Sequence, residues 1–419
     1  MTSHQNFSTV SMIGLGYIGL PTAAMFAARK TRVVGVDINQ HAVDTINQGR
    51  IHIVEPELDM IVRSAVTEGF LRATTRPEPA DAFLIAVPTP FKGDHEPDVS
   101  YVKAAAEAIA PVLKKGDLVV LESTSPVGTT EQMVQWLSGA RPDLRFAGAQ
   151  QGEVDVNVAY CPERVLPGHV VRELVANDRI IGGLTDACSA RAVDLYRIFV
   201  EGELLVTNAR TAEMCKLTEN SFRDVNIAFA NELSLICDKL DIDVWELIRL
   251  ANHHPRVKIL QPGAGVGGHC IAVDPWFIVD KTPEQARLIR TAREVNDGKP
   301  GWVIGKVNEA IARTGKAEAD VTLAVLGLAF KPNIDDLRES PALHIAEQLA
   351  RDTKARLQVV EPNVEQLPRT LQAASLVDLE AALKGSDIVV VLVGHREFAD
   401  LRTLLADGQV CVDAVGVLA

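Results

Sequence analysis

The sequence has no long apolar segment and no secretory signal at its start. No apolar run approaches the roughly 18 residues that indicate a membrane span. The first residues, MTSHQNFST, are polar and lack the basic start and apolar core of a signal peptide. We therefore expect a cytoplasmic protein without a membrane partner.

Basic residues are outnumbered, and the cysteines follow no metal-binding or disulfide pattern. The 419 residues include 42 Lys and Arg against 55 Asp and Glu, a formal net charge of -13, which argues against nucleic acid as a partner. Small anionic ligands remain compatible, because local donors can hold a phosphate. No CxxC pair or zinc-finger spacing occurs, so neither disulfides nor a metal is expected. The six cysteines are Cys161, Cys188, Cys215, Cys237, Cys270 and Cys411.

The order of apolar runs predicts an α/β fold. In the N-terminal part, VSMIGLG, RVVGVD, AFLIAVPTP, DLVVLESTSP and RIIGG alternate with helical segments, which is typical of parallel strands with crossover helices. From about Thr207 a long helical period takes over, and after Asp320 the strand signals return. We expect two Rossmann-like doubly wound domains, residues 1–206 and 319–419, joined by a central helical region, residues 207–318.

Two further patterns refine this division. In the central region, apolar residues at helical spacing predict one buried stripe, formed by Met214, Leu217, Val225, Phe229, Leu233 and Ile236. The later segment VTLAVLGLAFKP resembles the first strand and turn, STVSMIGLGYIGLP, as in a weak internal repeat. Because the second copy lacks the later glycines, we expect it to bind something other than a dinucleotide.

A GxGxxG motif follows the first predicted strand. Gly14, Gly16 and Gly19 would allow a tight turn and the approach of a pyrophosphate, and the next helix, PTAAMFAARK, would direct its N-terminal N–H groups at the anion. The second predicted strand ends at Asp37, about 20 residues further on, where a carboxylate accepts from a ribose hydroxyl. Since this carboxylate would repel a 2′-phosphate, we expect NAD rather than NADP. The alternative is a glycine-rich turn without a ligand.

Lys216 and Asn220 are candidates for stabilising oxygen charge. They lie four residues apart in the helical segment CKLTENSFR, so that both can face one side. A lysine and an amide donor together suit an alkoxide or a tetrahedral intermediate. The alternative is an ordinary solvated helical face.

Cys270 is the candidate nucleophile. It lies in GVGGHCIAVDP, where the glycines provide no shielding side chains and would let a ligand approach the backbone, and Asp274 follows four residues later. The neighbouring His269 need not be its base, because adjacent side chains usually point apart. Cys161 and Cys215 are rival thiols, whereas the other cysteines fit core patterns.

Single polar residues elsewhere have both a functional and an ordinary explanation. Glu163 in YCPERVLPG could act as a general base, or it could be a surface carboxylate in a proline-bounded turn. Arg256 in HHPRVKILQPG and Lys331 in LGLAFKPNIDDLRESP could hold phosphate or sugar oxygens. None of them is conclusive alone.

Taken in order, these segments resemble the nucleotide-sugar 6-dehydrogenase family, the UDP-glucose and GDP-mannose dehydrogenases. The resemblance is carried by GLGYIGLP, VPTP, ESTSPVGTT, YCPERVLPG, KLTEN, GVGGHCIAVDP and GLAFKPNIDDLRESP, and it covers nearly the whole chain. UDP-glucose enzymes typically have GGSC followed by a KD pair. Here His269 replaces the serine and Val273 the lysine, so glucose is a less expected substrate.

The resemblance implies a four-electron oxidation at C6 of a UDP-sugar, using two NAD. The sequence resembles most those family members that oxidise UDP-N-acetyl-D-mannosamine for a bacterial surface polysaccharide. UDP-N-acetylglucosamine and UDP-glucose are the alternative substrates. A thiolate at Cys270 would capture the aldehyde as a thiohemiacetal, and a second oxidation would give a thioester that water hydrolyses. Holding the aldehyde covalently makes the second oxidation unimolecular.

The resemblance also implies roles for individual residues and an assembly. The catalytic set would be Cys270, Lys216, Asn220, Asp274, Glu163 and Thr124; the NAD contacts Gly14, Gly16, Tyr17, Ile18, Gly19, Asp37, Pro88, Thr89 and Ser125; and the substrate contacts Arg164, Arg256, Gly267, Lys331 and Arg338. The family implies a homodimer built on the central helices, with the active site in the cleft between the α/β domains.

Two other interpretations stay open. In one, a two-electron dehydrogenase stops at the aldehyde or ketone and Cys270 is structural, so that one NADH forms per sugar rather than two. In the other, the chain is a non-catalytic NAD-binding or nucleotide-sugar-binding module. A damaged set of reactive residues would mark that module, whereas Lys216, Asn220, Cys270 and Asp274 are all present.

Overall fold

The computed structural model describes residues 7–53, 55, 57–148, 153–165, 168–268 and 270–419. The expectation for His269 therefore lies outside the described residues. The chain forms two compact units, Met1–Glu219 and Asn220–Ala419. The three-part division with boundaries at residues 206 and 318 stays a prediction.

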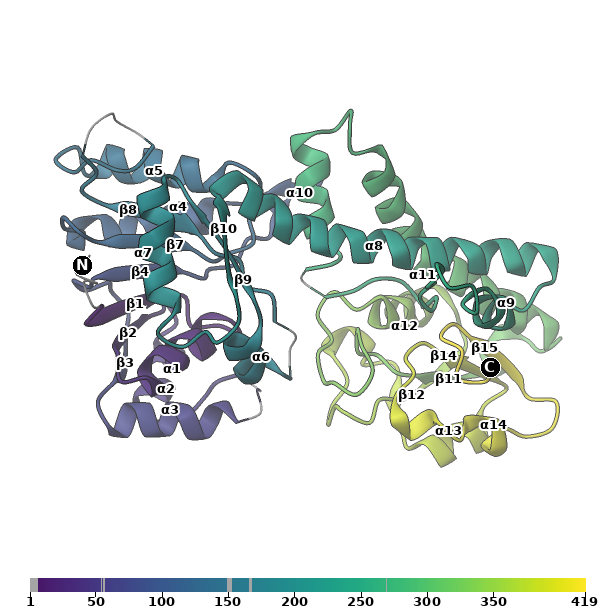
Figure 1. Ribbon diagram of the computed structural model, residues 1–419. Coiled ribbons are helices and arrows are strands. Elements are labelled where there is room, and N and C mark those ends of the chain that lie inside the picture. The colour runs from purple at the N-terminus through teal and green to yellow at the C-terminus, as the bar shows by residue number, and fades with distance from the viewer. Residues whose placement is uncertain (1–6, 54, 56, 149–152, 166–167, 269) are drawn as a thin grey trace. The chain divides into compact units, whose positions relative to one another are not determined.

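Unit 1 is built on an eight-stranded sheet in the order β10-β9-β8-β7-β4-β1-β2-β3 (Figure 1). All neighbouring strands are parallel except β8 and β9, which pair antiparallel. The strands are β1 Thr9–Ile13, β2 Arg32–Val36, β3 Leu71–Thr74, β4 Ala82–Ile85, β7 Leu118–Leu121, β8 Asn157–Tyr160, β9 Arg179–Gly183 and β10 Leu204–Asn208, and a hairpin joins β5 Phe91–Lys92 to β6 Glu96–Pro97.

Helices cover both faces of this sheet, as expected for a doubly wound fold. One core joins β1 to α1 Gly19–Ala28, α2 Gln40–Asn47, α3 Leu58–Thr67, α6 Val170–Ala176 and α7 Asp186–Tyr196. The other contains α4 Ser100–Ile109 and α5 Thr129–Ala140, which lie side by side in Figure 1. Nearly continuous buried runs such as Leu118–Leu121 explain why the apolar segments predicted these strands.

Unit 2 contains a smaller parallel sheet in the order β13-β12-β11-β14-β15, which matches the order β3-β2-β1-β4-β7 in the eight-stranded sheet of unit 1. Its strands are β11 Thr322–Leu326, β12 Arg356–Val360, β13 Ser375–Leu376, β14 Ile388–Val391 and β15 Val410–Asp413. The helices are α9 Val244–Ala251, α10 Asp274–Lys281, α11 Arg287–Arg313, α12 Pro341–Asp352, α13 Leu379–Gly385 and α14 Leu401–Leu404, and α8 Ala209–Leu240 runs from unit 1 into unit 2.

The predicted fold class is confirmed, and the internal repeat is visible in the backbone. Gly14 donates its N–H to the Val36 carbonyl, and Gly327 donates in the same way to Val360, with N···O distances of 2.8 and 2.9 Å. Both glycines have positive φ, +90° and +89°. The two sheets therefore begin with the same strand–turn geometry.

The buried apolar stripe predicted on α8 is wrong for half of its residues. Met214, Phe229 and Ile236 are 38, 53 and 44% exposed, whereas Leu217 is buried. About half of the buried residues of α8 are polar. Five of these polar residues have hydrogen-bond partners on other segments, and we call them the inner face: Glu213, Asn220, Asp224, Asn231 and Ser234.

The glycines before Cys270 have a packing role in addition to the ligand access that the sequence predicts. They are crowded by the segment between β11 and α12. A Cβ on Gly267 would lie 2.5 Å from the Glu339 carbonyl oxygen and 2.7 Å from Pro341 Cδ, and a Cβ on Gly268 would meet the Phe330 ring at 3.1 Å. Close packing between two backbone segments, rather than ligand access alone, therefore requires these glycines.

This packing can be tested at Gly267, whose φ is not positive, so that an added methyl group acts mainly through sterics. We expect Gly267→Ala to lower the free energy of unfolding by about 1–3 kcal/mol, as overpacking does. Gly263→Ala is the matched control, because its Cβ would meet only the Gly265 oxygen at 3.9 Å. Thermal denaturation of both variants measures the difference, and equal melting temperatures would contradict the packing explanation.

Candidate active site

The residues expected to bind the cofactor lie where neighbouring parallel strands end. Gly14 follows β1, Asp37 follows β2, Pro88 and Thr89 follow β4, and Ser125 follows β7. The carboxyl ends of parallel strands meet at one edge of the sheet, so these residues share that edge. The strand order reverses beside β1, and doubly wound sheets bind ligands at such a switch point.

The geometry of the glycine motif fits a dinucleotide. A Cβ on Gly14 would lie 2.5 Å from the Ala86 carbonyl oxygen, and one on Gly19 would overlap the Gly14 oxygen, so both glycines are needed for close backbone packing. Around Gly16 a Cβ would meet nothing within 4 Å. This leaves the turn open on the side from which a pyrophosphate would approach.

The helix start and the carboxylate beyond it also fit. Ile18 is the N-cap of α1 and gives it no side-chain cap, so the first N–H groups of the helix suit an anion. Asp37 accepts from Leu15 N at 2.9 Å through Oδ2 and from Asn39 N at 2.8 Å through Oδ1, which fixes a carboxylate that can still accept from a ribose. Tyr17 is 40% exposed beside them.

The segments after β4 and β7 are held together by hydroxyl groups. Thr89 Oγ1 donates to the Thr124 carbonyl at 2.6 Å, and Ser123 Oγ accepts from Val87 N at 2.9 Å. Ser125 is buried and donates to the Ser123 carbonyl at 2.9 Å. The structure therefore brings the predicted Thr89, Thr124 and Ser125 into one local cluster.

Glu163, which follows β8, belongs to a buried cluster of charged residues. Its Oε2 accepts from Arg179 NH2 at 2.9 Å and its Oε1 from Arg164 N at 2.6 Å. Arg179 NH1 also lies 3.8 Å from Glu122 Oε1, and Tyr196 OH donates to that oxygen at 2.5 Å. Glu163 is therefore a firmly held buried carboxylate, not a surface residue.

Burial in this cluster rules out Cys161 as a rival nucleophile. Cys161 is fully buried beside Arg179, and burial raises the pKa of its thiol to about 12. A thiol of this kind stays protonated at neutral pH and is a poor nucleophile. Cys215 is partly buried on α8, whereas Cys270 is exposed.

Arg164 is committed to contacts within unit 1. Its guanidinium pairs with Glu219 at 2.8 Å and donates to the Asp178 carbonyl at 3.0 Å. Together with Asn177, these residues line a polar hollow of about 280 Å³. Glu219 immediately precedes Asn220, so the predicted substrate residue contacts the KLTEN segment.

Lys216 is positioned by an anchor that sequence reasoning missed. Glu213, one turn before it on α8, is fully buried and accepts from Gly128 N at 2.6 Å, Thr130 N at 2.8 Å and Thr130 Oγ1 at 2.7 Å. It thereby satisfies the first N–H groups of α5. A helical turn places a carboxylate at 213 on the side of Lys216, but nothing in the sequence indicates its partner.

In unit 2, the structure joins two of the predicted catalytic residues. Asn220 Nδ2 donates to Asp274 Oδ2 at 2.5 Å, and both side chains are buried. Asp274 is the first residue of α10, and its N–H donates to the Cys270 carbonyl at 2.8 Å. Cys270 thus lies exposed on the turn that leads into the helix carrying Asp274.

The remaining substrate candidates of unit 2 lie on loops. Arg256 and Lys331 are exposed, and Arg338 pairs with Asp336 at 2.6 Å. Gly267 packs against the segment that holds Lys331 and Arg338. The loop that carries Cys270 is therefore attached to the loop after β11.

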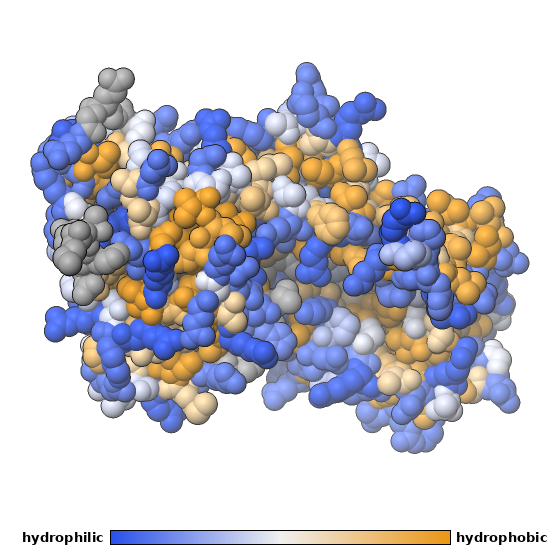
Figure 2. All heavy atoms as spheres, in the orientation of Figure 1, coloured by the Kyte–Doolittle hydropathy of each residue, from blue (hydrophilic) through white to orange (hydrophobic). Residues whose placement is uncertain are grey.

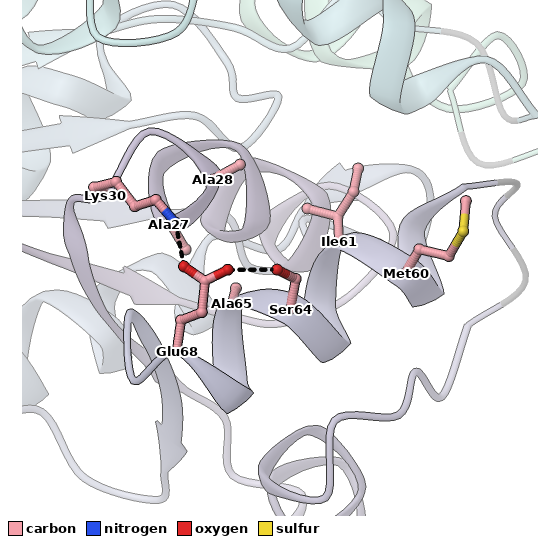
Figure 3. Close-up of a pocket in the computed structure, with 8 residues that line it drawn as sticks. All are labelled: Ala27, Ala28, Lys30, Met60, Ile61, Ser64, Ala65 and Glu68. Carbon is pink, nitrogen blue, oxygen red and sulfur yellow. Dashed lines mark hydrogen bonds and ion pairs between the residues drawn. The ribbon is translucent and has the colours of Figure 1, made fainter.

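A shallow groove of about 250 Å³ between α1 and α3 contains none of the predicted site residues. In Figure 3, Glu68 accepts from Ser64 and pairs with Lys30 on its rim. The described residues include no group of three or more His, Cys, Asp or Glu placed to hold a metal ion. None of the helices in the described part of the chain is both long and apolar enough to span a bilayer.

Known proteins resemble this chain over almost its whole length. It is 66% identical to UDP-N-acetyl-D-mannosamine dehydrogenase of Salmonella typhi, over 98% of this chain and 99% of the relative. It is 64% identical to NDP-N-acetyl-D-galactosaminuronic acid dehydrogenase of Ralstonia nicotianae, over 98 and 96%. The solved structure of UDP-D-ManNAc dehydrogenase from Pyrococcus horikoshii is 40% identical, with a TM-score of 0.88 and coverage of 98 and 96%.

Three models of one family match consecutive parts of the chain. The NAD binding domain of the UDP-glucose/GDP-mannose dehydrogenase family matches residues 8–200, its central domain residues 210–298, and its UDP binding domain residues 324–419. The glycine turn and Asp37 lie in the first of these, and Cys270 in the second. The chain therefore belongs to the UDP-glucose/GDP-mannose dehydrogenase family, and its first part is an NAD-binding domain.

Proposed function

We propose that the protein oxidises UDP-N-acetyl-D-mannosamine at C6 to UDP-N-acetyl-D-mannosaminuronate, a four-electron reaction that consumes two NAD. The observation that carries this proposal is the arrangement around Cys270: an exposed thiol on the turn before α10, whose first residue, Asp274, is buried and hydrogen-bonded to Asn220. A two-electron dehydrogenase needs no such thiol. NAD would accept the hydrides, and the glycine turn and Asp37 would hold it.

Cys270 would work as a temporary covalent anchor. After the alcohol has lost its first hydride and a proton, the thiol adds to the aldehyde carbon and forms a thiohemiacetal. Loss of a second hydride and a proton from this adduct gives a thioester, and attack by water releases the carboxylate and regenerates the thiol. The sugar thus cannot diffuse away between the oxidations, which makes the second one unimolecular.

Lys216 and Asn220 would stabilise the oxygen on the reacting carbon. Their positions one turn apart on α8 let an ammonium and an amide act on the same oxygen. The anchor at Glu213 and the Asn220–Asp274 hydrogen bond fix this part of the helix on both sides of Lys216. Such preorganised donors stabilise charge without reorganisation during the reaction.

The hydrolytic step would use carboxylates. Asp274 accepts from Asn220 through one oxygen, and Glu163 is oriented by Arg179 and Arg164 N. Either group could position or activate the attacking water. Thr124, joined to Thr89, would lie near the reacting group through a bound water. Arg256, Lys331 and Arg338 would contact the nucleotide or sugar.

The choice of sugar rests on the named relatives. Dehydrogenases of UDP-N-acetyl-D-mannosamine are 66% identical in Salmonella typhi and 40% identical in Pyrococcus horikoshii. The relative from Ralstonia nicotianae, at 64% identity, favours an N-acetylgalactosamine sugar as the second candidate. Both candidates carry an N-acetyl group, in keeping with the departures from the glucose-specific pattern at residues 269 and 273. NAD and UDP-sugars are cytoplasmic metabolites, so we propose a cytoplasmic enzyme.

The covalent step can be tested with Cys270→Ser. Because serine is a far poorer nucleophile without a strong base, we expect uronate formation to fall by orders of magnitude while NAD still binds. Equilibrium titration with NAD and steady-state NADH formation measure the two properties. Uronate production close to that of the unaltered enzyme would remove the thioester from the mechanism.

Substrate choice and stoichiometry can be measured together. We expect the largest kcat/KM with UDP-N-acetyl-D-mannosamine, compared with the N-acetylglucosamine, N-acetylgalactosamine and glucose nucleotides and with GDP-mannose. Two NADH should form for each sugar consumed, counted by absorbance against product. One NADH per sugar would identify a two-electron dehydrogenase, and a preference for UDP-N-acetylgalactosamine would favour the second candidate.

We also propose a homodimer built on α8. Phe222, Phe229 and Ile236, spaced seven residues apart, and Leu240 are 68, 53, 44 and 61% exposed and form what we call the outer stripe. Figure 2 shows apolar surface over the C-terminal part of α8. A seven-residue apolar repeat is the pattern by which two helices pack along a seam, and a second copy of α8 offers the same pattern.

The outer stripe gives a direct test of the dimer. Two charges buried at the seam should prevent association, so Phe229→Glu should sediment as a monomer at concentrations where the unaltered protein is a dimer. Met60→Glu is the matched control, because Met60 is also an exposed apolar residue, 70% exposed, but lies on α3. A dimeric Phe229→Glu variant, or a monomeric parent, would contradict the proposal.

A further inference from the structure

The cluster behind Glu163 contains groups that the proposed reaction does not use. Arg179, on β9, is 3% exposed, and its guanidinium stacks over the rings of Tyr196 and Phe199, 4.9 and 5.5 Å from their centroids. Its NH2 binds Glu163 at 2.9 Å, while NH1 lies 3.8 Å from Glu122. One buried cation is therefore shared by two buried carboxylates.

The two carboxylates are not equivalent. Glu163 has the shorter contact with Arg179 and a second donor, Arg164 N. Glu122 accepts only from Tyr196 OH through Oε1, and its Oε2 has no hydrogen-bond partner among the described residues. Because one cation cannot balance two buried anions, the less satisfied Glu122 is the one that takes up a proton.

We propose that Arg179 is a positioning residue that aims the Glu163 carboxylate for thioester hydrolysis, and that Glu122 is its competitor for the same guanidinium. Neutral Glu122 leaves Arg179 with Glu163, whereas ionised Glu122 draws the guanidinium toward itself. This inference rests on the proposed function, because only that reaction gives Glu163 a task.

The charges facing Glu122 place this competition near neutral pH. Burial raises the pKa of Glu122 from 4.5 to about 7, although the charge of Arg179 opposes the shift. Burial raises the pKa of Cys161 to about 12 and that of Tyr196 well above 10, and Arg179 stays charged because the neighbouring anions raise its pKa. Glu122 is surrounded by Arg179, Glu163, Cys161 and Tyr196. Cys161 and Tyr196 therefore stay neutral while Glu122 titrates.

The linkage between Glu122 and folding has a definite sign. A raised pKa in the folded state means that the folded protein holds a proton that the unfolded chain has lost between pH 4.5 and about 7. The stabilisation is complete below the lower value and is lost as the pH rises through the upper one. The melting temperature of Glu122→Gln relative to the unaltered protein should therefore rise across this range.

The kinetic experiment compares Arg179→Gln, Arg179→Lys and Glu122→Gln with the parent in rapid-mixing and steady-state assays with UDP-N-acetyl-D-mannosamine and NAD. For Arg179→Gln we expect a burst of two NADH per active site followed by a steady state at least tenfold slower, with KM lowered along with kcat and kcat/KM little changed, because hydrolysis alone is impaired. Arg179→Lys should recover part of the steady-state rate. The ratio of the Glu122→Gln rate to the parent rate should be constant below about pH 6, rise through the pKa of Glu122 and be higher above about pH 8.

A purely structural role of Arg179 would give neither the NADH burst nor the pH-dependent rate ratio. Arg293→Lys is the matched control: Arg293 is a second fully buried arginine, paired with Asp224 at 2.6 Å in unit 2, and should show neither the burst nor the pH-dependent ratio. If Arg179→Gln does not fold, the burst in Arg179→Lys and the rate ratio of Glu122→Gln still test the proposal. No burst in a folded Arg179 variant, or a flat rate ratio while the melting difference changes with pH, would overturn the proposal. Failure of the proposed function would instead appear in the parent, as other than two NADH per sugar.

Discussion

The register of α8 is fixed by buried polar groups, and the candidate site depends on that register. Each polar side chain of the inner face has a specific partner. Glu213 binds the N-terminus of α5, Asn220 binds Asp274, and Ser234 binds Lys299. Asp224 binds Arg293 and Asn296, and Asn231 binds Asn296 and the Gly263 N–H. A rotation or shift of the helix would break several of these contacts at once. It is disfavoured because a buried polar group without a partner costs free energy. An apolar face would tolerate such slippage much better.

The positions of the reactive groups follow from this constraint. Lys216 lies between two anchored turns of α8, and Asn220 is itself an anchor through Asp274. Asn231 holds the backbone at Gly263, where the segment leading to Cys270 begins, and Phe330 and Pro341 pack on the glycines that follow. Burying polar groups on one face also leaves apolar residues on the other, so the same arrangement that orders the site creates the outer stripe.

The elements with local sequence signals are predictable from the sequence, whereas those set by distant partners are not. The GxGxxG turn and the buried strands were predictable because a strand, a tight turn and a helix follow one another within thirty residues or so. The sequence shows the helical period of α8 but not which face is buried, since buried polar residues such as Asp224 cannot be told from surface residues in a sequence. Glu122, Glu163 and Arg179 meet only through strand order. The packing of the glycines before Cys270 cannot be predicted either, because Phe330 and Glu339 are more than sixty residues away in the sequence.

The central claim is that the sulfur of Cys270 bonds to the half-oxidised sugar. Acid-quenching the unaltered enzyme during turnover, followed by mass spectrometry of the peptide that contains Cys270, tests it most directly. We expect an adduct on that cysteine with the mass of the UDP-sugar in thiohemiacetal or thioester linkage, dependent on both NAD and substrate. Full turnover to uronate with Cys270 unmodified at every quench time would contradict it.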